Sequence, residues 1–216
     1  YVMDHLSKFY LWIKSHGSFV QILDQTSASP CKLQQFCLYL QTATWDDNLS
    51  CQNNDVAPET QQHWEEMKNI GYKGPKVLAE NLIYFGVRDT EDEEDKQIEK
   101  LNIKNYKVDE VRYRGLETCV AEALSKLTHC EVLYISFDVD SMDCDMISYG
   151  TGTPVPKGFD QYEIIAIINQ IIQTKKVVCI EFVEVNPLLD TKGNKMAETA
   201  FEVLEAITTT LVLPIE

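Results

Sequence analysis

Two aspartates stand two positions apart at the end of an apolar run, within Ser136–Asp143 (SFDVDSMD). In an extended chain, residues i and i+2 point to the same side, so the carboxylates of Asp138 and Asp140 can reach one ligand. Burial of two like charges so close together is costly without a cation between them. Hard divalent cations prefer oxygen ligands. The pair therefore predicts a metal site, although a strand that runs into an acidic turn is an equally good interpretation of D-x-D alone.

Polar residues also follow three other apolar runs, where they could face a ligand. His16 follows the first run, Arg88 and Asp89 follow the second, and Glu184 follows the fourth. A lone histidine after a strand is more often structural than a ligand, and the Arg-Asp pair favours a structural ion pair over a substrate role. Glu184 either faces a cationic substrate group or is solvated. Between the third and fourth runs, Gly150–Pro156 (GTGTPVP) is a glycine-rich turn that can bring backbone close to a ligand.

The elements that must position these residues read as alternating strands and helices. Apolar runs rich in β-branched and aromatic residues predict strands buried on both faces. These runs are Phe9–Ile13, Leu82–Val87, Val132–Phe137 and Val177–Val183. Apolar residues at helical spacing predict helices over 116–127, over 164–172 and from about 197 to 207. Such alternation predicts an α/β fold with a parallel sheet, in which ligands collect at the carboxyl ends of the strands.

Composition limits the class of protein. A chain of 216 residues fits one domain, and a formal charge of -15 argues against nucleic acid or an anionic membrane as partner. The acidic run Glu91–Asp95 favours a solvated loop or the start of a helix. The seven cysteines include no C-x-x-C pair, which favours buried free thiols and a cytoplasmic location. No apolar run approaches the length of a membrane span.

Taken in chain order, the four strand ends resemble the arginase (ureohydrolase) family. The resemblance is carried by G-V-R-D at Gly86–Asp89, S-F-D-V-D-x-x-D at Ser136–Asp143, T-G-T-P at Thr151–Pro154 and E-V-N-P at Glu184–Pro187. It implies one domain over 1–216 with a doubly wound parallel sheet between two layers of helices. It also implies a homotrimer or homohexamer that holds two manganese ions, whose bridging hydroxide attacks the guanidinium carbon of arginine and releases urea.

The resemblance assigns roles to individual residues on the matching motifs. The implied metal ligands are His16, Asp138 and Asp140. The implied catalytic residues are Asp140 and Glu184, of which Glu184 receives the guanidinium group through charge-assisted hydrogen bonds. The implied substrate-binding residues are Thr153, Glu184, Ser27 and Glu91.

The amino-terminal part departs from the family pattern. The family's D-A-H-x-D reads Lys14–Ser18 (KSHGS) here, so both flanking aspartates are absent. The family's S-G-N-x-H-G reads SASPCKL from Ser27, without its histidine, and the upstream G-G-D-H has no counterpart. We therefore expect a chain that lacks the amino-terminal part of the family fold. Three of six ligands remain, which predicts at most one manganese ion, and Lys14 would repel that cation.

Three functions stay open at this point. The first is a weak or inactive arginase-like protein that keeps the fold, and its oligomer, for an interaction or regulatory role. The second is an active hydrolase of arginase or formimidoylglutamase type. The third is a single-metal hydrolase with altered chemistry. The stretch Lys14–Ser18 separates them, because it holds the lost ligands.

Overall fold

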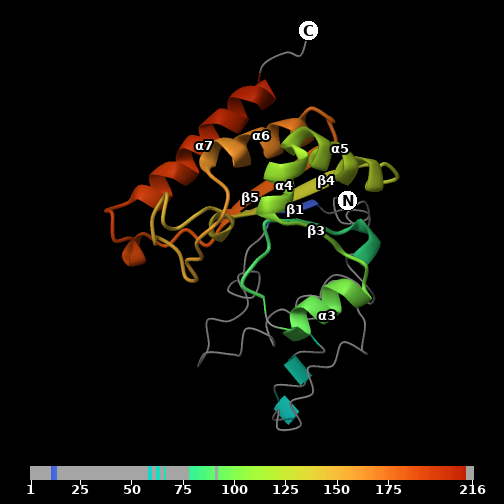
Figure 1. The fold of residues 1–216 in the computed structure, drawn as a ribbon, viewed down its shortest axis with the longest axis horizontal. Coiled ribbons are helices and arrows are strands. Elements are labelled where there is room, and N and C mark those ends of the chain that lie inside the picture. The colour runs from blue at the N-terminus through green and yellow to red at the C-terminus, as the bar shows by residue number, and fades with distance from the viewer. Residues whose placement is uncertain are drawn as a thin grey trace.

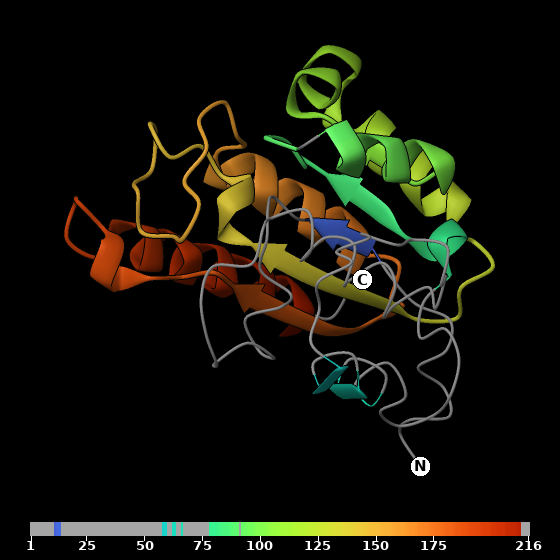
Figure 2. The same cartoon turned by 90° about the horizontal axis from the view of Figure 1, so that it is seen from below.

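A parallel sheet forms the centre of the protein. The computed structural model describes residues 11–13, 58–59, 62–63, 66, 78–90 and 92–212. Within these residues, five strands pair in parallel in the order β3-β2-β1-β4-β5. They are β1 (Leu11–Ile13), β2 (Ile83–Phe85), β3 (Lys104–Tyr106), β4 (Leu133–Asp138) and β5 (Val177–Val183). Figure 2 shows β1, β4 and β5 side by side. The predicted parallel α/β class is thereby confirmed.

The strand order reverses beside β1. The chain proceeds from β1 outward through β2 to β3, and then crosses back to place β4 and β5 on the other side of β1. In open α/β sheets, ligands bind beside the carboxyl ends of strands where the order reverses. Ile13, the last residue of β1, pairs in register with Phe137, the residue before Asp138. The D-x-D motif therefore lies at the reversal point.

Helices cover the sheet from two sides (Figure 1). Most of them lie on one face: α4 (Val108–Arg114), α5 (Leu116–Lys126), α6 (Gln161–Ile172) and α7 (Lys195–Val212). On the opposite side lies α3 (Asp92–Lys100), which follows β2. Single 3-10 turns complete the described elements: η3 (Ala79–Asn81), η4 (Val139–Ser141) and η5 (Pro187–Leu189). Among the described helices, none is long and apolar enough to cross a membrane.

The main core lies between the sheet and α4–α7. Leu133, Ile135 and Phe137 of β4 are at most 1% exposed and join one hydrophobic cluster with the isoleucines of α6. Because side chains alternate along a strand, Ser136 and Asp138 point to the other face. Among the described cysteines, Cys119, Cys130 and Cys144 are buried, whereas Cys179 is exposed.

Three elements differ from the sequence-based expectation or add to it. The acidic run after β2 begins the helix α3, one of the two alternatives that the sequence left open, but Glu94 within it is buried and not solvated. Neither β3 nor α4 was indicated by the apolar pattern, because each is short and carries few apolar residues. The predicted strands at 132–137 and 177–183 are confirmed, as are the helices over 116–127 and 164–172 and the last helix, which extends further than predicted. The prediction that the strand 177–183 is buried on both faces is wrong, because Val178 of β5 is 59% exposed.

Candidate functional site

The end of β4 turns sharply because Asp138 caps the 3-10 turn that follows. The side chain of Asp138 accepts a hydrogen bond from the backbone N–H of Asp140 at 2.9 Å. Its carbonyl oxygen accepts one from the Ser141 hydroxyl at 2.7 Å. Asp138 and Asp140 are 0% and 1% exposed, so two carboxyl groups are buried within one turn. Burial of such a pair without compensating partners would be costly.

The glycine-rich loop lies directly against Asp140. The hydroxyls of Thr151 and Thr153 donate to Asp140 Oδ1 and Oδ2 respectively, so each carboxylate oxygen has one hydroxyl partner. Thr153 was predicted to line the site, whereas Thr151 was not assigned a role. The signal was present in the sequence, because hydroxyls at i and i+2 can point to the same side of an extended loop. The two threonines therefore act together on one carboxyl group.

Glu184 approaches the same loop from the end of β5. It follows the last strand residue directly and adopts a positive φ of 67°, which turns the chain at the sheet edge. A Cβ atom added at Gly152 would lie 3.2 Å from Glu184 Oε2, so glycine allows this close approach. The N–H of Asn186 donates to the carbonyl of Gly150 at 2.8 Å and ties the two loops together. Three predicted residues, Asp140, Thr153 and Glu184, are thus brought together.

The surroundings of Asp140 disfavour its charged form. Burial raises the pKa of Asp140 to about 7, and the negative charge of Glu184 acts in the same direction. The two threonine hydroxyls and Arg88 act in the opposite direction but do not cancel the effect of burial. A bound cation would favour the carboxylate form by direct attraction. The electrostatics of this carboxyl group therefore suit a cation ligand.

The donor set in the described part is incomplete for a metal ion. Asp138 and Asp140 supply hard oxygen ligands, which manganese accepts. However, among the residues that the structure describes, no group of three or more His, Cys, Asp or Glu side chains could hold a metal. The two carboxylates fit manganese as part of a ligand set, and a third ligand must come from another segment. His16, Ser27 and Glu91 lie outside the described residues, so their predicted roles stay predictions.

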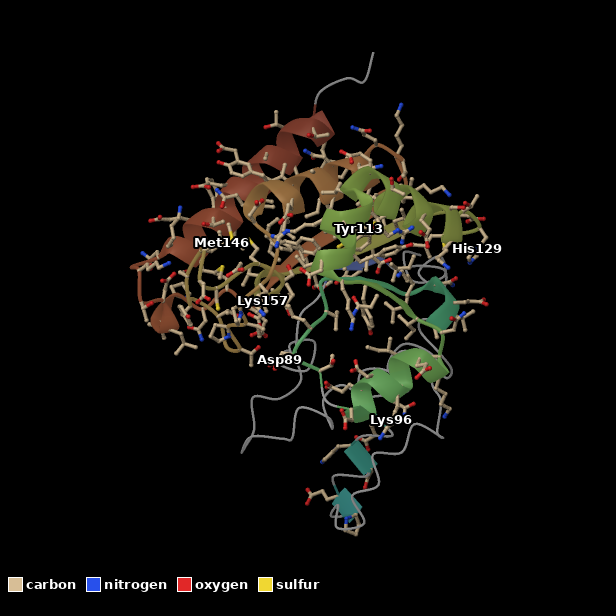
Figure 3. The ribbon with its side chains drawn as sticks, viewed as in Figure 1. Asp89, Lys96, Tyr113, His129, Met146 and Lys157 are labelled. Atoms are coloured by element: carbon tan, nitrogen blue, oxygen red, sulfur yellow. The ribbon has the colours of Figure 1, made fainter. Side chains whose placement is uncertain are left out.

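Arg88 makes hydrogen bonds with backbone carbonyl groups on the loops around Asp140. The predicted Arg88–Asp89 ion pair stays a prediction. Asp89, Met146 and Lys157, labelled in Figure 3, lie on the loops that follow β2 and β4. These loops and the one after β5 form the carboxyl edge of the sheet, where the candidate site lies.

Comparisons with known proteins point to one family. The family described as "Arginase family" matches residues 16–209. The arginase of Bacillus subtilis (strain 168) is 32% identical over 143 residues, which are 66% of this chain and 48% of that protein. The chain thus spans about half the length of the curated relatives that it matches.

Solved structures agree with this match. A crystal structure of arginase from Bacillus subtilis superposes with a TM-score of 0.63 at 31% identity, and covers 70% of this chain and 55% of its own. The Helicobacter pylori arginase superposes with a TM-score of 0.72 at 22% identity, over 96% of this chain and 64% of its own. The second likeness concerns the fold alone.

Proposed function

Because the chain belongs to the arginase family, we propose that its carboxyl-edge site binds a guanidino compound and at most one manganese ion, with weak or no hydrolysis. The observation that carries the proposal is the convergence of Asp140, Thr153 and Glu184 at the strand-order reversal. We further propose that the complete protein has the three-layer, doubly wound arrangement of its relatives. Cytoplasmic location and assembly as a homotrimer or homohexamer belong to the same proposal.

Each residue of the proposed site has a distinct task. The Glu184 carboxylate receives the guanidinium group, for which paired charge-assisted hydrogen bonds are well suited. Asp138 and Asp140 would hold manganese, with His16 as a third ligand. Manganese held there would supply activation of a water molecule for hydrolysis of the guanidinium group. Thr151 and Thr153 hold the Asp140 carboxylate in place through its two oxygens.

Weak activity follows from the ligands that the sequence lacks. Lys14 and Ser18 occupy the positions of the two family aspartates that flank the histidine. Loss of both would leave one metal of the family pair with a single carboxylate, and the positive charge of Lys14, two positions before His16, would oppose cation binding. A single His and two carboxylates can still form an open site for one ion.

Metal content and urea release test the proposal together. Purified protein supplied with manganese should retain at most one ion per chain by elemental analysis. Urea release from arginine should be far below that of an arginase assayed in parallel. Two tightly held ions, or urea release at the rate of that arginase, would instead support an active arginase or formimidoylglutamase-type hydrolase.

Ligand binding tests the role of Glu184 separately from turnover. Calorimetry should detect binding of arginine, and Glu184→Gln should weaken that binding by about tenfold or more, as expected for loss of a charge-assisted pair. The control is Glu205→Gln, an exposed glutamate of α7 whose substitution should leave binding unchanged. Unchanged binding in Glu184→Gln would remove Glu184 from the substrate site.

A non-catalytic oligomeric interaction protein is the main alternative. It is favoured by the same incomplete ligand set, and it requires neither manganese nor arginine to bind. This alternative would be favoured if elemental analysis finds no manganese and calorimetry finds no arginine binding, while light scattering shows a trimer or hexamer.

A further inference from the structure

The guanidinium group of Arg88 connects three segments of backbone behind the site. Arginine has five N–H donors in a rigid planar fork, and here each donor can be matched with a carbonyl oxygen. Nε donates to Pro156 (3.1 Å), Nη1 to Gly86 (3.3 Å) and Ser141 (3.4 Å), and Nη2 to Met142 (3.1 Å) and Val155 (2.6 Å). The acceptors lie at the end of β2, in the turn after Asp140 and in the loop after Thr153. One side chain therefore bonds to backbone from all three places.

Two of these segments carry the residues of the candidate site. Ser141 and Met142 directly follow Asp140, and Val155 and Pro156 follow Thr153 by two and three positions. We propose that Arg88 is a positioning residue that fixes the threonine loop (Gly150–Pro156) against the turn of Asp138 and Asp140. The inference rests on the proposed function of this site. It concerns a residue for which the sequence pattern predicts only an ion pair with Asp89.

The backbone around the loop is also held without Arg88. Phe159 N–H donates to the carbonyl of Ser141, and Asp143 N–H donates to the carbonyl of Phe159, both at 2.9 Å. A variant at Arg88 should therefore still fold, and the threonine loop should be less firmly held. The quantity to measure is therefore the local stability of the loop.

Charge and geometry can be separated at this position. Burial lowers the pKa of Arg88, while the carboxyl groups of Asp143 and Asp140 act to raise it, so its positive charge is close to the acidic turn. A lysine would keep that charge, but its compact ammonium has three donors and cannot span carbonyls from three segments. Arg88→Lys therefore removes the clamp and retains the charge, whereas Arg88→Met removes both.

Hydrogen exchange on the full-length, metal-free protein tests the clamp directly. In Arg88→Lys, amides of residues 150–157 should exchange about tenfold faster or more, the effect of losing one or two hydrogen bonds, while β4 and β5 keep their protection. The control is Arg112→Lys. Arg112 donates to the carbonyl of Gly158 at 3.0 Å and to Glu163, so it contacts backbone just beyond the threonine loop, and its substitution should leave exchange of the loop unchanged. Wild-type exchange of the loop in Arg88→Lys would overturn the inference.

Manganese affinity distinguishes positioning from a purely electrostatic role, because the two predict different signs. If Arg88 positions Asp140, both Arg88→Lys and Arg88→Met should bind manganese more weakly than the wild type. If Arg88 acts only through its charge, Arg88→Lys should bind manganese like the wild type, and Arg88→Met should bind it more tightly. Either result would overturn the inference. If the protein binds no manganese at all, which the proposed function allows, hydrogen exchange decides the role of Arg88.

Discussion

At Asp140, burial and hydrogen bonding act on one carboxyl group in opposite directions. Burial dominates and raises its pKa from the ordinary value for aspartate to about 7. The folded protein then binds a proton that the unfolded chain releases, so stability is highest below the unfolded pKa and falls as the pH rises toward 7. In the presence of a chelator, we expect the metal-free protein to lose stability between about pH 4 and pH 7, with a plateau above that range.

Substitution of Asp140 isolates this contribution. Asp140→Asn cannot ionise, so at pH 8 with chelator it should be more stable than the wild type by roughly 4 kcal/mol, the equivalent of a shift of about three pKa units. At pH 4 the two proteins should be equally stable. Urea denaturation at both pH values measures the difference, with Asp109→Asn on the exposed face of α4 as control. Equal stability of Asp140→Asn and wild type at pH 8 would contradict the burial argument.

The lost aspartates beside His16 permit a repair at the scale of single residues. Lys14→Asp with Ser18→Asp would restore both carboxylates of the family motif and remove one positive charge. We expect this double variant to bind manganese more tightly, measured by calorimetry. The single variant Lys14→Ser serves as control, because it removes the charge without adding a ligand. Unchanged affinity in the double variant would show that His16 does not correspond to the family histidine.

At the scale of elements, α6 begins with a capping box that also joins α4. Asp160 Oδ1 accepts from the Glu163 N–H, and Glu163 Oε2 accepts from the Asp160 N–H, each at 2.8 Å. The guanidinium of Arg112 donates to both oxygens of Glu163, at 2.7 and 2.8 Å. We expect Asp160→Ala to lower the free energy of unfolding by about 1 kcal/mol. Glu163→Ala should cost more, because it also removes the acceptor of Arg112.

Urea denaturation measures both effects, and α5 supplies the control. Glu117 is an exposed acidic residue in the first turn of α5, whose N-cap residue, Gly115, provides no side-chain cap. Glu117→Ala should therefore change stability by only a few tenths of a kcal/mol, the contribution of a charge near a helix end. A loss in Glu117→Ala as large as that in Asp160→Ala would show that capping is not the cause.

The strands that the sequence pattern predicts are those with nearly continuous apolar residues, whether buried as in β4 or partly exposed as in β5. β4 and β5 read as continuous apolar runs, so their bounds agree with the structure within one residue. β3 has the sequence KNY, and its identity as a strand depends on pairing with β2, where Asn105 lies opposite Tyr84. Such pairing is a tertiary effect that a local pattern does not contain.

The same distinction applies to the site. The spacing of Asp138 and Asp140 predicts a metal site or an acidic turn with equal weight, and the roles of Thr153 and Glu184 come from the resemblance to the family motifs. The clamp by Arg88 depends on carbonyls up to 68 residues away along the chain, and a carbonyl group carries no signature of residue type. Contacts of that kind follow from the three-dimensional arrangement alone.

At the scale of the whole molecule, the excess of carboxylates should make stability depend on salt. The chain has 34 Asp and Glu against 19 Lys and Arg, so its net charge at pH 7 is -15. Salt screens the repulsion among the excess carboxylates. It also screens the attraction in surface ion pairs such as Arg112–Glu163. Exposed ion pairs contribute about 0–1 kcal/mol each. Repulsion among the excess carboxylates should therefore prevail.

We expect the melting temperature at pH 7.5 to rise by several degrees, roughly the effect of 1 kcal/mol, when NaCl increases from about 20 mM to about 500 mM. Near the sequence pI of about 4.6 the net charge vanishes, so the same increase in salt should leave the melting temperature unchanged or lower it. Calorimetric scans at both pH values provide the comparison. A rise in melting temperature of equal size at both pH values would contradict this explanation, because the net charge is absent near the pI. General salting-out would then be the cause.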